Sequence, residues 1–296
     1  MGTTFLWRLE LLIQPSEPQP SEAHPVKVKE ALRAFGTDYR DAELLLLHSL
    51  GKDERSWLIA HDHDELPTDV VEVFSSMSTE RLKGVPLAYL LGHREFWSLK
   101  LKVTCDVLIP RPETELLVEW AVELASHYDL DSMLDLGTGS GAIALAVQHD
   151  LPNLSVTASD VSELALSVAR ENAEGLGLPV EFVESSWFGA LAQRRWGLIA
   201  SNPPYVSVDD AHLLEGDLRF EPNTALTDGG DGLSSIREIV SNAPDHLEAG
   251  GWLLIEHGYD QAADVGSILE LNGFSKVSLR NDLAGRPRVT GGYWQC

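Results

Sequence analysis

The N-terminal third of the chain has the hydrophobic spacing of short helices. Within residues 26–91, apolar side chains recur every three or four positions, most clearly over residues 68–82. A shorter helical pattern covers residues 41–51. Short helices with brief connections predict a small helical bundle. Residues 1–25 contain four prolines among polar residues, so we expect a flexible head there.

The pattern changes over residues 92–110. Polar and apolar residues alternate over residues 96–103, as is typical of a strand. We therefore expect a hairpin that links two domains. A proline-rich and acidic segment, residues 110–115, follows and favours a helix start, because proline and acidic residues suit a first helical turn.

From residue 132 onward, apolar runs alternate with helical patterns. The helical patterns lie between the first five runs, which predicts a mostly parallel sheet with covering helices. Only a turn separates the last two runs, so we expect them to pair antiparallel. Residues 111–296 should thus form one α/β domain with a seven-stranded sheet. The predicted strands are residues 132–136, 154–159, 180–184, 196–201, 252–257, 276–280 and 288–294.

Composition narrows the classes of partner and location. The 22 basic and 46 acidic side chains give a formal net charge of −24, which disfavours binding to a nucleic-acid backbone. The only cysteines, Cys105 and Cys296, form neither a disulfide framework nor a zinc ligand set. No apolar run approaches the roughly 20 residues that span a bilayer. We expect a cytoplasmic protein without a membrane partner, and a monomer, because no spare interface stands out.

A glycine-rich turn follows the first predicted strand of the sheet. Its sequence is Gly137-Thr138-Gly139-Ser140-Gly141, and glycines permit a tight turn with close approach of the backbone to a ligand. Asp160 ends the next strand, where an acidic residue can accept both hydroxyls of a ribose. The spacing fits either a dinucleotide or S-adenosylmethionine. No candidate for a hydride-transfer site is evident, which favours S-adenosylmethionine.

Two more side chains near this turn have alternative interpretations. Asp135 could hold the cationic end of a methionine moiety, or it could cap amides of the loop. Trp187, after the third strand, could line an adenine pocket or belong to the core, where Phe188 is expected. The run from His61 to Asp64 contains ligand-type residues, but a solvated loop is favoured and no metal site is predicted.

The sequence Asn202-Pro203-Pro204-Tyr205 follows the fourth predicted strand. Open α/β sheets bind ligands at the carboxyl edge of their strands. The two prolines restrict the backbone here, and hydrogen-bond acceptors outnumber donors. We call this four-residue segment the ledge. It could hold a planar NH2 group, although a proline-rich turn without further role is the alternative.

Taken together, the motifs resemble one family, the glutamine N5-methyltransferases that modify peptide chain release factors. The resemblance begins at about residue 26 and covers almost all the remaining chain. It implies a helical N-terminal domain that serves in substrate recognition (residues 26–91), a class I methyltransferase domain and S-adenosyl-L-methionine as methyl donor. It further implies the glutamine of a Gly-Gly-Gln motif in class I peptide chain release factors as acceptor. The matching segments are residues 92–97, 109–115, 135–141, 202–205, 220–222 and 228–233.

The resemblance also assigns roles to individual positions. Residues predicted to contact the cofactor are Gly137, Thr138, Gly139, Ser140, Gly141, Asp160, Trp187 and Asn202. Those predicted to hold the substrate glutamine and to act in catalysis are Asn202, Pro203, Pro204 and Tyr205. Ser186 departs from the family, where Asp is common.

Three alternatives remain open. A glutamine methyltransferase of a ribosomal protein shares the ledge, but the Pro-Glu of Arg111-Pro112-Glu113-Thr114-Glu115 favours the release factor. A second alternative is an N6-adenine nucleic-acid methyltransferase, because the adenine base also offers a planar NH2 group, yet such an enzyme must flip the base out and bind phosphates. A third alternative is a non-enzymatic module that binds S-adenosylmethionine. The roles of Arg111, Glu113 and Glu221 are left open, and Glu256-His257 is expected to be structural or at the pocket edge.

Overall fold

The structure, a computed structural model, describes residues 25–34, 38–211 and 216–295. The predicted head, residues 1–25, lies almost wholly outside these ranges, as does Cys296. The chain divides into two compact units, Met1–Leu91 and Gly92–Cys296. Each unit has its own hydrophobic core.

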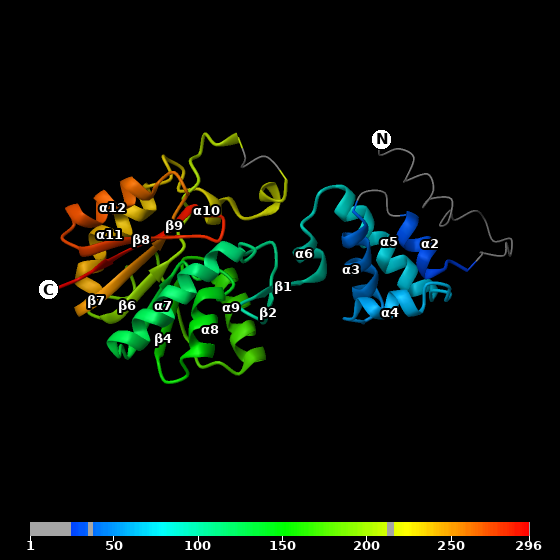
Figure 1. Cartoon of the computed structure of the whole chain (residues 1–296), viewed down its shortest axis with the longest axis horizontal. Helices are drawn as coiled ribbons and strands as arrows, with labels where there is room; N and C mark the ends of the chain where they lie inside the picture. The colour runs from blue at the N-terminus through cyan, green and yellow to red at the C-terminus, as the bar shows by residue number, and fades with distance from the viewer. Residues whose placement is uncertain (1–24, 35–37, 212–215, 296) are drawn as a thin grey trace. The chain divides into compact units, whose positions relative to one another are not determined.

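The first unit is helical over its described part, with α2 (Val28–Ala34), α3 (Tyr39–Ser49), α4 (Arg55–Ala60), α5 (Thr68–Leu82) and α6 (Leu87–Leu91) (Figure 1). Asp38 begins α3, because its side chain accepts a hydrogen bond from the Arg40 amide at 2.8 Å. Helix α5 spans the predicted residues and buries Phe74 against α3. Leu82, the last apolar residue of the predicted 68–82 pattern, is exposed.

Residues 92–110 begin the second unit. They include an antiparallel hairpin of β1 (His93–Phe96) and β2 (Leu99–Lys102). The alternating pattern predicted strand through Trp97 and Ser98, but both have positive φ, 51° and 61°, and form the turn. The hairpin packs into the second unit. Phe96 and Leu101 are buried in the core of the second unit, and the Lys102 amide donates to Asn172 Oδ1 at 2.6 Å.

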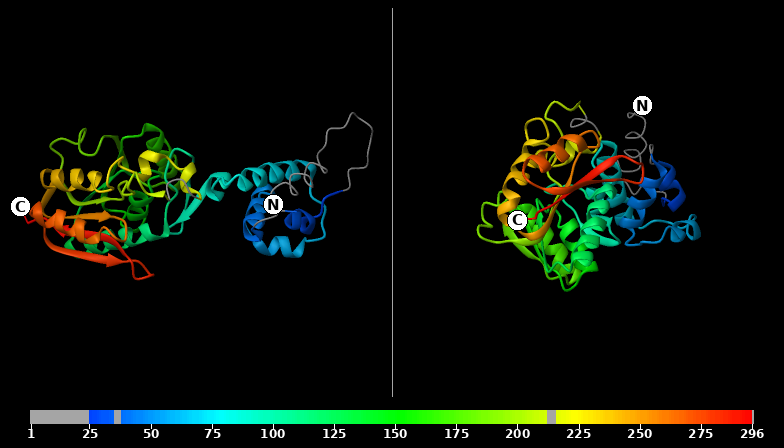
Figure 2. Two further views of the ribbon diagram at one scale, coloured as in Figure 1. Left: turned by 90° about the horizontal axis from the view of Figure 1, so that it is seen from above. Right: turned by 60° about the vertical axis from the view of Figure 1, so that its left-hand side comes forward.

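A seven-stranded sheet, in the order β5-β4-β3-β6-β7-β9-β8, forms the centre of the second unit. Its first five strands in sequence are parallel, and β9 pairs antiparallel with both neighbours (the orange-to-red hairpin in Figure 2). Both expectations for the sheet are therefore met. The strands are β3 (Ser132–Leu136), β4 (Ser155–Asp160), β5 (Glu181–Glu184), β6 (Trp196–Ser201), β7 (Leu247–Glu256), β8 (Ser275–Asn281) and β9 (Pro287–Tyr293).

Helices cover both faces of this sheet (Figure 1). One face packs against α7 (Glu115–Tyr128), α8 (Ala142–Asp150) and α9 (Glu163–Leu176). The other face packs against α11 (Ser234–His246) and α12 (Ala262–Leu271). Short helices η1 (Pro112–Thr114), η3 (Leu218–Phe220) and α10 (Asn223–Leu226) lie in the connections.

The helical pattern expected between β5 and β6 is not realised. Residues 185–195 form turns, and two of them that are not glycine, Trp187 and Gln193, have positive φ of 45° and 65°. A right-handed helix cannot continue through such residues. The Ser185 hydroxyl stabilises the turn, since it donates to the Trp187 carbonyl at 2.7 Å and accepts from the Ala190 amide at 3.0 Å.

Candidate active site

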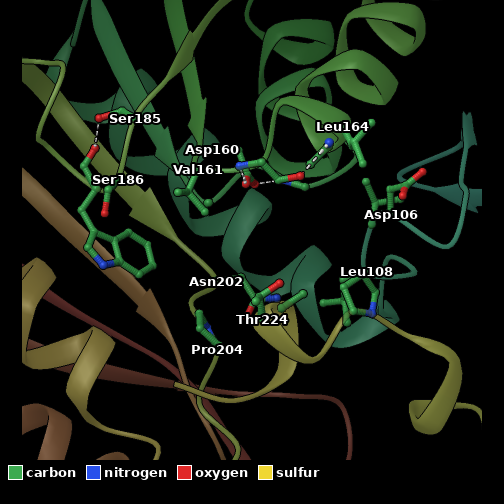
Figure 3. Close-up of a pocket in the computed structure, with 18 of the residues that line it drawn as sticks. Asp106, Leu108, Asp160, Val161, Leu164, Ser185, Ser186, Asn202, Pro204 and Thr224 are labelled. Carbon is green, nitrogen blue, oxygen red and sulfur yellow. Dashed lines mark hydrogen bonds between the residues drawn. The ribbon is translucent and has the colours of Figure 1, made fainter. Parts of the chain in front are cut away.

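A cavity of about 340 Å³ lies beside the carboxyl ends of β3, β4 and β6 (Figure 3). Parallel strands place their carboxyl ends at one edge of the sheet, so residues distant in sequence converge there. Figure 3 shows Asp160, Ser186 and Asn202 around the same opening. The predicted site residues that line the cavity are Gly137, Gly139, Asp160, Trp187, Asn202 and Pro204.

The three glycines of the turn have different local surroundings. All have positive φ, 73° at Gly137, 56° at Gly139 and 84° at Gly141. A Cβ atom at Gly139 would meet no heavy atom within 4 Å, so this backbone faces open space in the cavity wall. A Cβ atom at Gly141 would lie 3.0 Å from Leu145 and 3.2 Å from Ala169, so Gly141 permits helix packing. The turn therefore leaves room for a ligand at Gly139.

Asp160 holds the same turn in place. Its Oδ2 accepts a hydrogen bond from the Gly139 amide, and its Oδ1 accepts one from the Ser162 amide, both at 2.9 Å. Burial raises the pKa of Asp160, while these two hydrogen bonds lower it. Each carboxylate oxygen retains acceptor capacity toward the cavity. The geometry is compatible with the predicted bonds to ribose hydroxyls.

Asp135 lies behind the turn and is fully buried. Its Oδ2 accepts from Thr138 Oγ1 at 2.6 Å and from the Ala144 amide at 3.2 Å. Burial raises the pKa of Asp135 to about 7. Oδ2 thus anchors Thr138 of the turn and Ala144 of α8, whereas Oδ1 is buried with no hydrogen-bond partner among the described residues. Thr138 is thereby turned toward Asp135, and buried Ser140 accepts from Asn172 Nδ2 through its carbonyl at 2.9 Å.

Trp187 contributes to both the core and the cavity. Its ring would lie 3.6 Å from a Cβ atom at Gly137, and the side chain also packs against the core beneath the sheet. The two alternatives considered for Trp187 are thus not exclusive. Phe188 is buried, as expected of a core residue.

Contacts to other elements hold the ledge at both ends. Asn202 Nδ2 donates to the Thr114 hydroxyl at 3.2 Å, which leaves Asn202 Oδ1 as the acceptor of this side chain. The Tyr205 hydroxyl lies 3.5 Å from Glu256 Oε1, and the Tyr205 carbonyl accepts from Gln261 Nε2 at 3.0 Å. Pro203 is buried, whereas Pro204 faces the cavity. Burial raises the pKa of Tyr205 well above its ordinary value, so its hydroxyl keeps its proton.

Gly232 fits directly against the ledge. It has a φ of 78°, and a Cβ atom there would lie only 2.3 Å from the Tyr205 carbonyl oxygen. The loop that carries Gly232 is organised by Asp228, whose Oδ1 accepts from the amides of Gly230 and Gly232 at 2.8 and 3.1 Å. Only a glycine permits this approach without displacement of the ledge.

The sequence did not reveal two walls of the cavity. One comprises residues 105–108, which follow β2, and the other comprises Pro222, Thr224 and Ala225 around α10. Glu221 joins these walls, because it accepts from the Ile109 amide at 3.1 Å and forms an ion pair with Arg111. The sequence of these segments shows only local strand or turn patterns, and such patterns do not indicate that two distant segments line the same cavity.

Asp231 has contacts that turn chemistry explains. Its Oδ1 accepts from the Leu233 amide at 3.0 Å, and it forms an ion pair with Arg237. Over residues 25–34, 38–211 and 216–295, no three His, Cys, Asp or Glu side chains gather in a way that could hold a metal ion. The same ranges contain no helix long and apolar enough to cross a membrane.

Comparisons with known proteins agree with this architecture. Residues 113–231 match the family described as "Methyltransferase small domain", and residues 27–92 match the "PrmC N-terminal domain". The chain is 48% identical to "Release factor glutamine methyltransferase" of Xylella fastidiosa strain Temecula1, over 85% of this chain and 92% of the relative. It is 49% identical to the protein of that name from Pseudomonas aeruginosa, over 86% and 92%. The chain belongs to the release factor glutamine methyltransferase family.

Membership of the release factor glutamine methyltransferase family confirms the family, the fold class and the methyl donor, S-adenosylmethionine, that the motifs predicted. Solved structures at low identity confirm the fold alone. A methyltransferase from Pyrococcus furiosus is 16% identical with a TM-score of 0.52, over 75% of this chain and 100% of that chain. The hMettl16 catalytic domain is 19% identical with a TM-score of 0.54, over 71% and 79%.

Proposed function

We propose that this chain transfers the methyl group of S-adenosylmethionine to the side-chain amide nitrogen, N5, of a glutamine in a class I peptide chain release factor. The relatives that share almost half of its residues carry the name of this activity. One structural observation carries the proposal for the site. The NH2 group of Asn202 is bonded to Thr114, so the Asn202 oxygen is the atom available to a planar NH2 donor at the cavity.

The glycine turn and Asp160 fit the donor. Gly139 presents open backbone to the cavity, and Asp160 retains acceptor capacity there. We assign Gly137 through Gly141, Asp160, Trp187 and Asn202 to cofactor binding, with Thr138, Ser140 and Gly141 acting through the shape of the turn. When bound, the donor supplies a methyl group on a sulfonium, which needs no activation by an acid or a base.

The ledge would hold the methyl acceptor, the side chain of the substrate glutamine. In our proposal, one N–H of the substrate glutamine donates to Asn202 Oδ1 and the other to the Pro203 carbonyl, while Tyr205 packs against the amide plane. An amide nitrogen is a poor nucleophile because its lone pair is delocalised. Two acceptors would orient the nitrogen and stabilise the charge that it gains. No dedicated base is required, since an N-methylated amide cation is strongly acidic.

The overall charge supports a protein substrate over a nucleic acid. A formal net charge of −24 opposes binding to phosphates, whereas an exposed protein loop carries no such requirement. We further propose that the enzyme acts in the cytoplasm as a monomer, with no membrane or nucleic-acid partner.

A methyl-transfer assay tests the proposed function. Labelled S-adenosylmethionine would be offered with purified release factor, with its Gln→Ala variant at the Gly-Gly-Gln motif, with ribosomal protein and with DNA. We expect label in the intact release factor alone, at the glutamine side chain. Label in ribosomal protein or DNA, with none in the release factor, would overturn the proposal. Binding of S-adenosylmethionine without transfer to any of these substrates would support a binding module instead.

A further inference from the structure

A buried group of polar side chains lies beneath the ledge, outside the cavity lining. Thr114 is 4% exposed and Glu256 is 1% exposed, and both come from elements distant in sequence from the ledge. Thr114 ends η1 and directly precedes α7, while Glu256 is the last residue of β7. Burial of a polar group destabilises the fold unless the group is hydrogen-bonded, so these two side chains are expected to have hydrogen-bond partners.

The donor and the acceptor of each hydrogen bond in this group can be assigned. Asn202 Nδ2 can only donate, so Thr114 Oγ1 accepts at 3.2 Å. The Thr114 hydroxyl proton must then point elsewhere, and hydrogen bonding from Thr114 lowers the pKa of Glu256. The Tyr205 hydroxyl also donates toward Glu256, with 3.5 Å to Oε1. An ionised Glu256 can only accept hydrogen bonds, and its Oε2 is buried with no hydrogen-bond partner among the described residues, so the carboxylate has capacity for the Thr114 hydroxyl proton as well as for Tyr205.

The assignment of donors matters because the oxygen and the NH2 group of an Asn side chain have nearly the same shape. A flip of the Asn202 amide would place its NH2 group at the cavity and its oxygen toward Thr114. The flipped ledge would present donors to the substrate NH2 group and would repel it. Without the Thr114 acceptor, little in the described contacts distinguishes the two orientations.

We propose that Thr114 and Glu256 are positioning residues, which set the orientation of the Asn202 amide so that its oxygen faces the substrate nitrogen. This inference rests on the proposed function for its effect on catalysis. The orientation itself does not depend on which substrate is methylated. Glu256 acts through Thr114 and Tyr205, because it is buried and absent from the cavity lining.

Kinetics of three variants test the proposal. Thr114→Val removes the acceptor at constant shape, Thr114→Ser retains it, and Thr157→Val removes another buried hydroxyl, 2% exposed, that has no contact with Asn202. We expect Thr114→Val to lower kcat about 10- to 100-fold with little change in KM or in cofactor Kd. Thr114→Ser should recover most of kcat, and Thr157→Val should stay within about twofold of wild type. Equal kcat for Thr114→Val and Thr157→Val would overturn the proposal.

The pH profile provides a second readout for Glu256. The charged groups that face it are Glu113 of η1 and Arg288 of β9, and burial raises its pKa to about 7. Below that pH, a protonated Glu256 no longer requires both hydroxyls to donate to it. We expect kcat of the wild type to fall as pH decreases through about 7, and we expect Glu256→Gln to abolish that dependence at a lower kcat. An unchanged pH dependence in Glu256→Gln would contradict its role.

A spectroscopic readout separates this inference from the proposed function. The side-chain NH2 signals of Asn202, assigned by their loss in Asn202→Ala, report its hydrogen bond without any substrate. We expect Thr114→Val to shift these signals and to speed their exchange with solvent, whereas Thr157→Val leaves them unchanged. Unchanged Asn202 signals in Thr114→Val would disprove the positioning role, even if release factor is methylated. Shifted signals would support it, even if the substrate proves to be another protein.

Discussion

On one side of the cavity, hydrogen bonds join residues close in sequence, and on the other side they join residues far apart. Asp135 and Thr138 are 3 positions apart, and Asp160 and Gly139 are 21 apart. We call the side formed by residues 137–141, Asp135 and Asp160 the glycine-turn side. The ledge depends on longer connections, with 88 positions between Asn202 and Thr114.

This difference in contact range suggests that the two sides affect different steps, namely cofactor binding and turnover. The turn is held by the strands and the helix next to it in sequence, so it needs only that local unit to form. A ledge held by η1 and β7 forms only when the whole unit is folded. Substitutions on the glycine-turn side should therefore weaken cofactor binding. Substitutions around the ledge should lower turnover while cofactor binding is retained.

Loss of the Asn202 amide should give the largest effect on the ledge side. Asn202→Ala removes the proposed acceptor for the substrate nitrogen, so we expect kcat to fall about 100- to 1000-fold. Cofactor Kd, measured by calorimetry, should change far less. Asn242→Ala, on the exposed face of α11, is the control and should behave as wild type. Near-wild-type turnover in Asn202→Ala would remove the ledge from the mechanism.

A pair of glycine variants can move the ledge without touching its side chains. Gly232→Ala places a Cβ atom 2.3 Å from the Tyr205 carbonyl oxygen, while Gly229→Ala meets no atom within 4 Å. Both residues have similar φ values, 78° and 76°, so backbone strain is matched. We expect Gly232→Ala to lower kcat about 10- to 100-fold more than Gly229→Ala, through displacement of the ledge. Equal kcat in the two variants would show that catalysis tolerates that displacement.

On the glycine-turn side, Asp160→Asn should affect cofactor affinity. An amide at this position presents a donor to the amide of Gly139 or Ser162, so one of the two hydrogen bonds is lost. We expect cofactor Kd to rise about 10-fold, with kcat at saturating cofactor close to wild type. The exposed Asp245→Asn serves as control. A fall in kcat at saturation with unchanged Kd would reverse the assignment of the two sides.

The same contrast explains what the sequence could predict. Strands β3 and β6 match the predicted ranges residue for residue, because a buried parallel strand appears as a local apolar run. The glycine turn and Asp160 were equally visible, since their spacing follows from one unit of strand, turn, helix and next strand. The 185–195 segment was mispredicted as helical, because the positive φ of Trp187 depends on contacts that sequence does not display.

Sequence patterns could not predict contacts between residues that are far apart in the chain. Nothing in the residues near Thr114 indicates that it meets Asn202, and residues 105–108 were regarded as part of a linker rather than a cavity wall. The pairing of Glu221 with Arg111 depends on the folded positions of two segments 110 positions apart. Such contacts follow from topology and not from local propensity, so they required the structure.

The smallest effect expected concerns stability and involves Asp135, on the glycine-turn side. Burial raises its pKa from 3.8 to about 7, so the folded state binds a proton that the unfolded chain releases. Its stabilising contribution is complete below about pH 4 and is lost as pH rises through about 7, at no more than about 1.4 kcal/mol per pH unit.

Asp135→Asn removes this titration and retains an oxygen for the Ala144 amide. We therefore expect the thermal midpoint of the wild type to fall more steeply between pH 5 and pH 7 than that of the variant, by a few degrees in all. Above pH 8 the two curves should run parallel, because both states of the wild type are then ionised at this position. The acidic surface, with a net charge of −24, affects both proteins alike and cancels in the difference. Parallel curves across the whole range would show that the Asp135 carboxyl is ionised in its buried position, held there by Thr138 and the Ala144 amide.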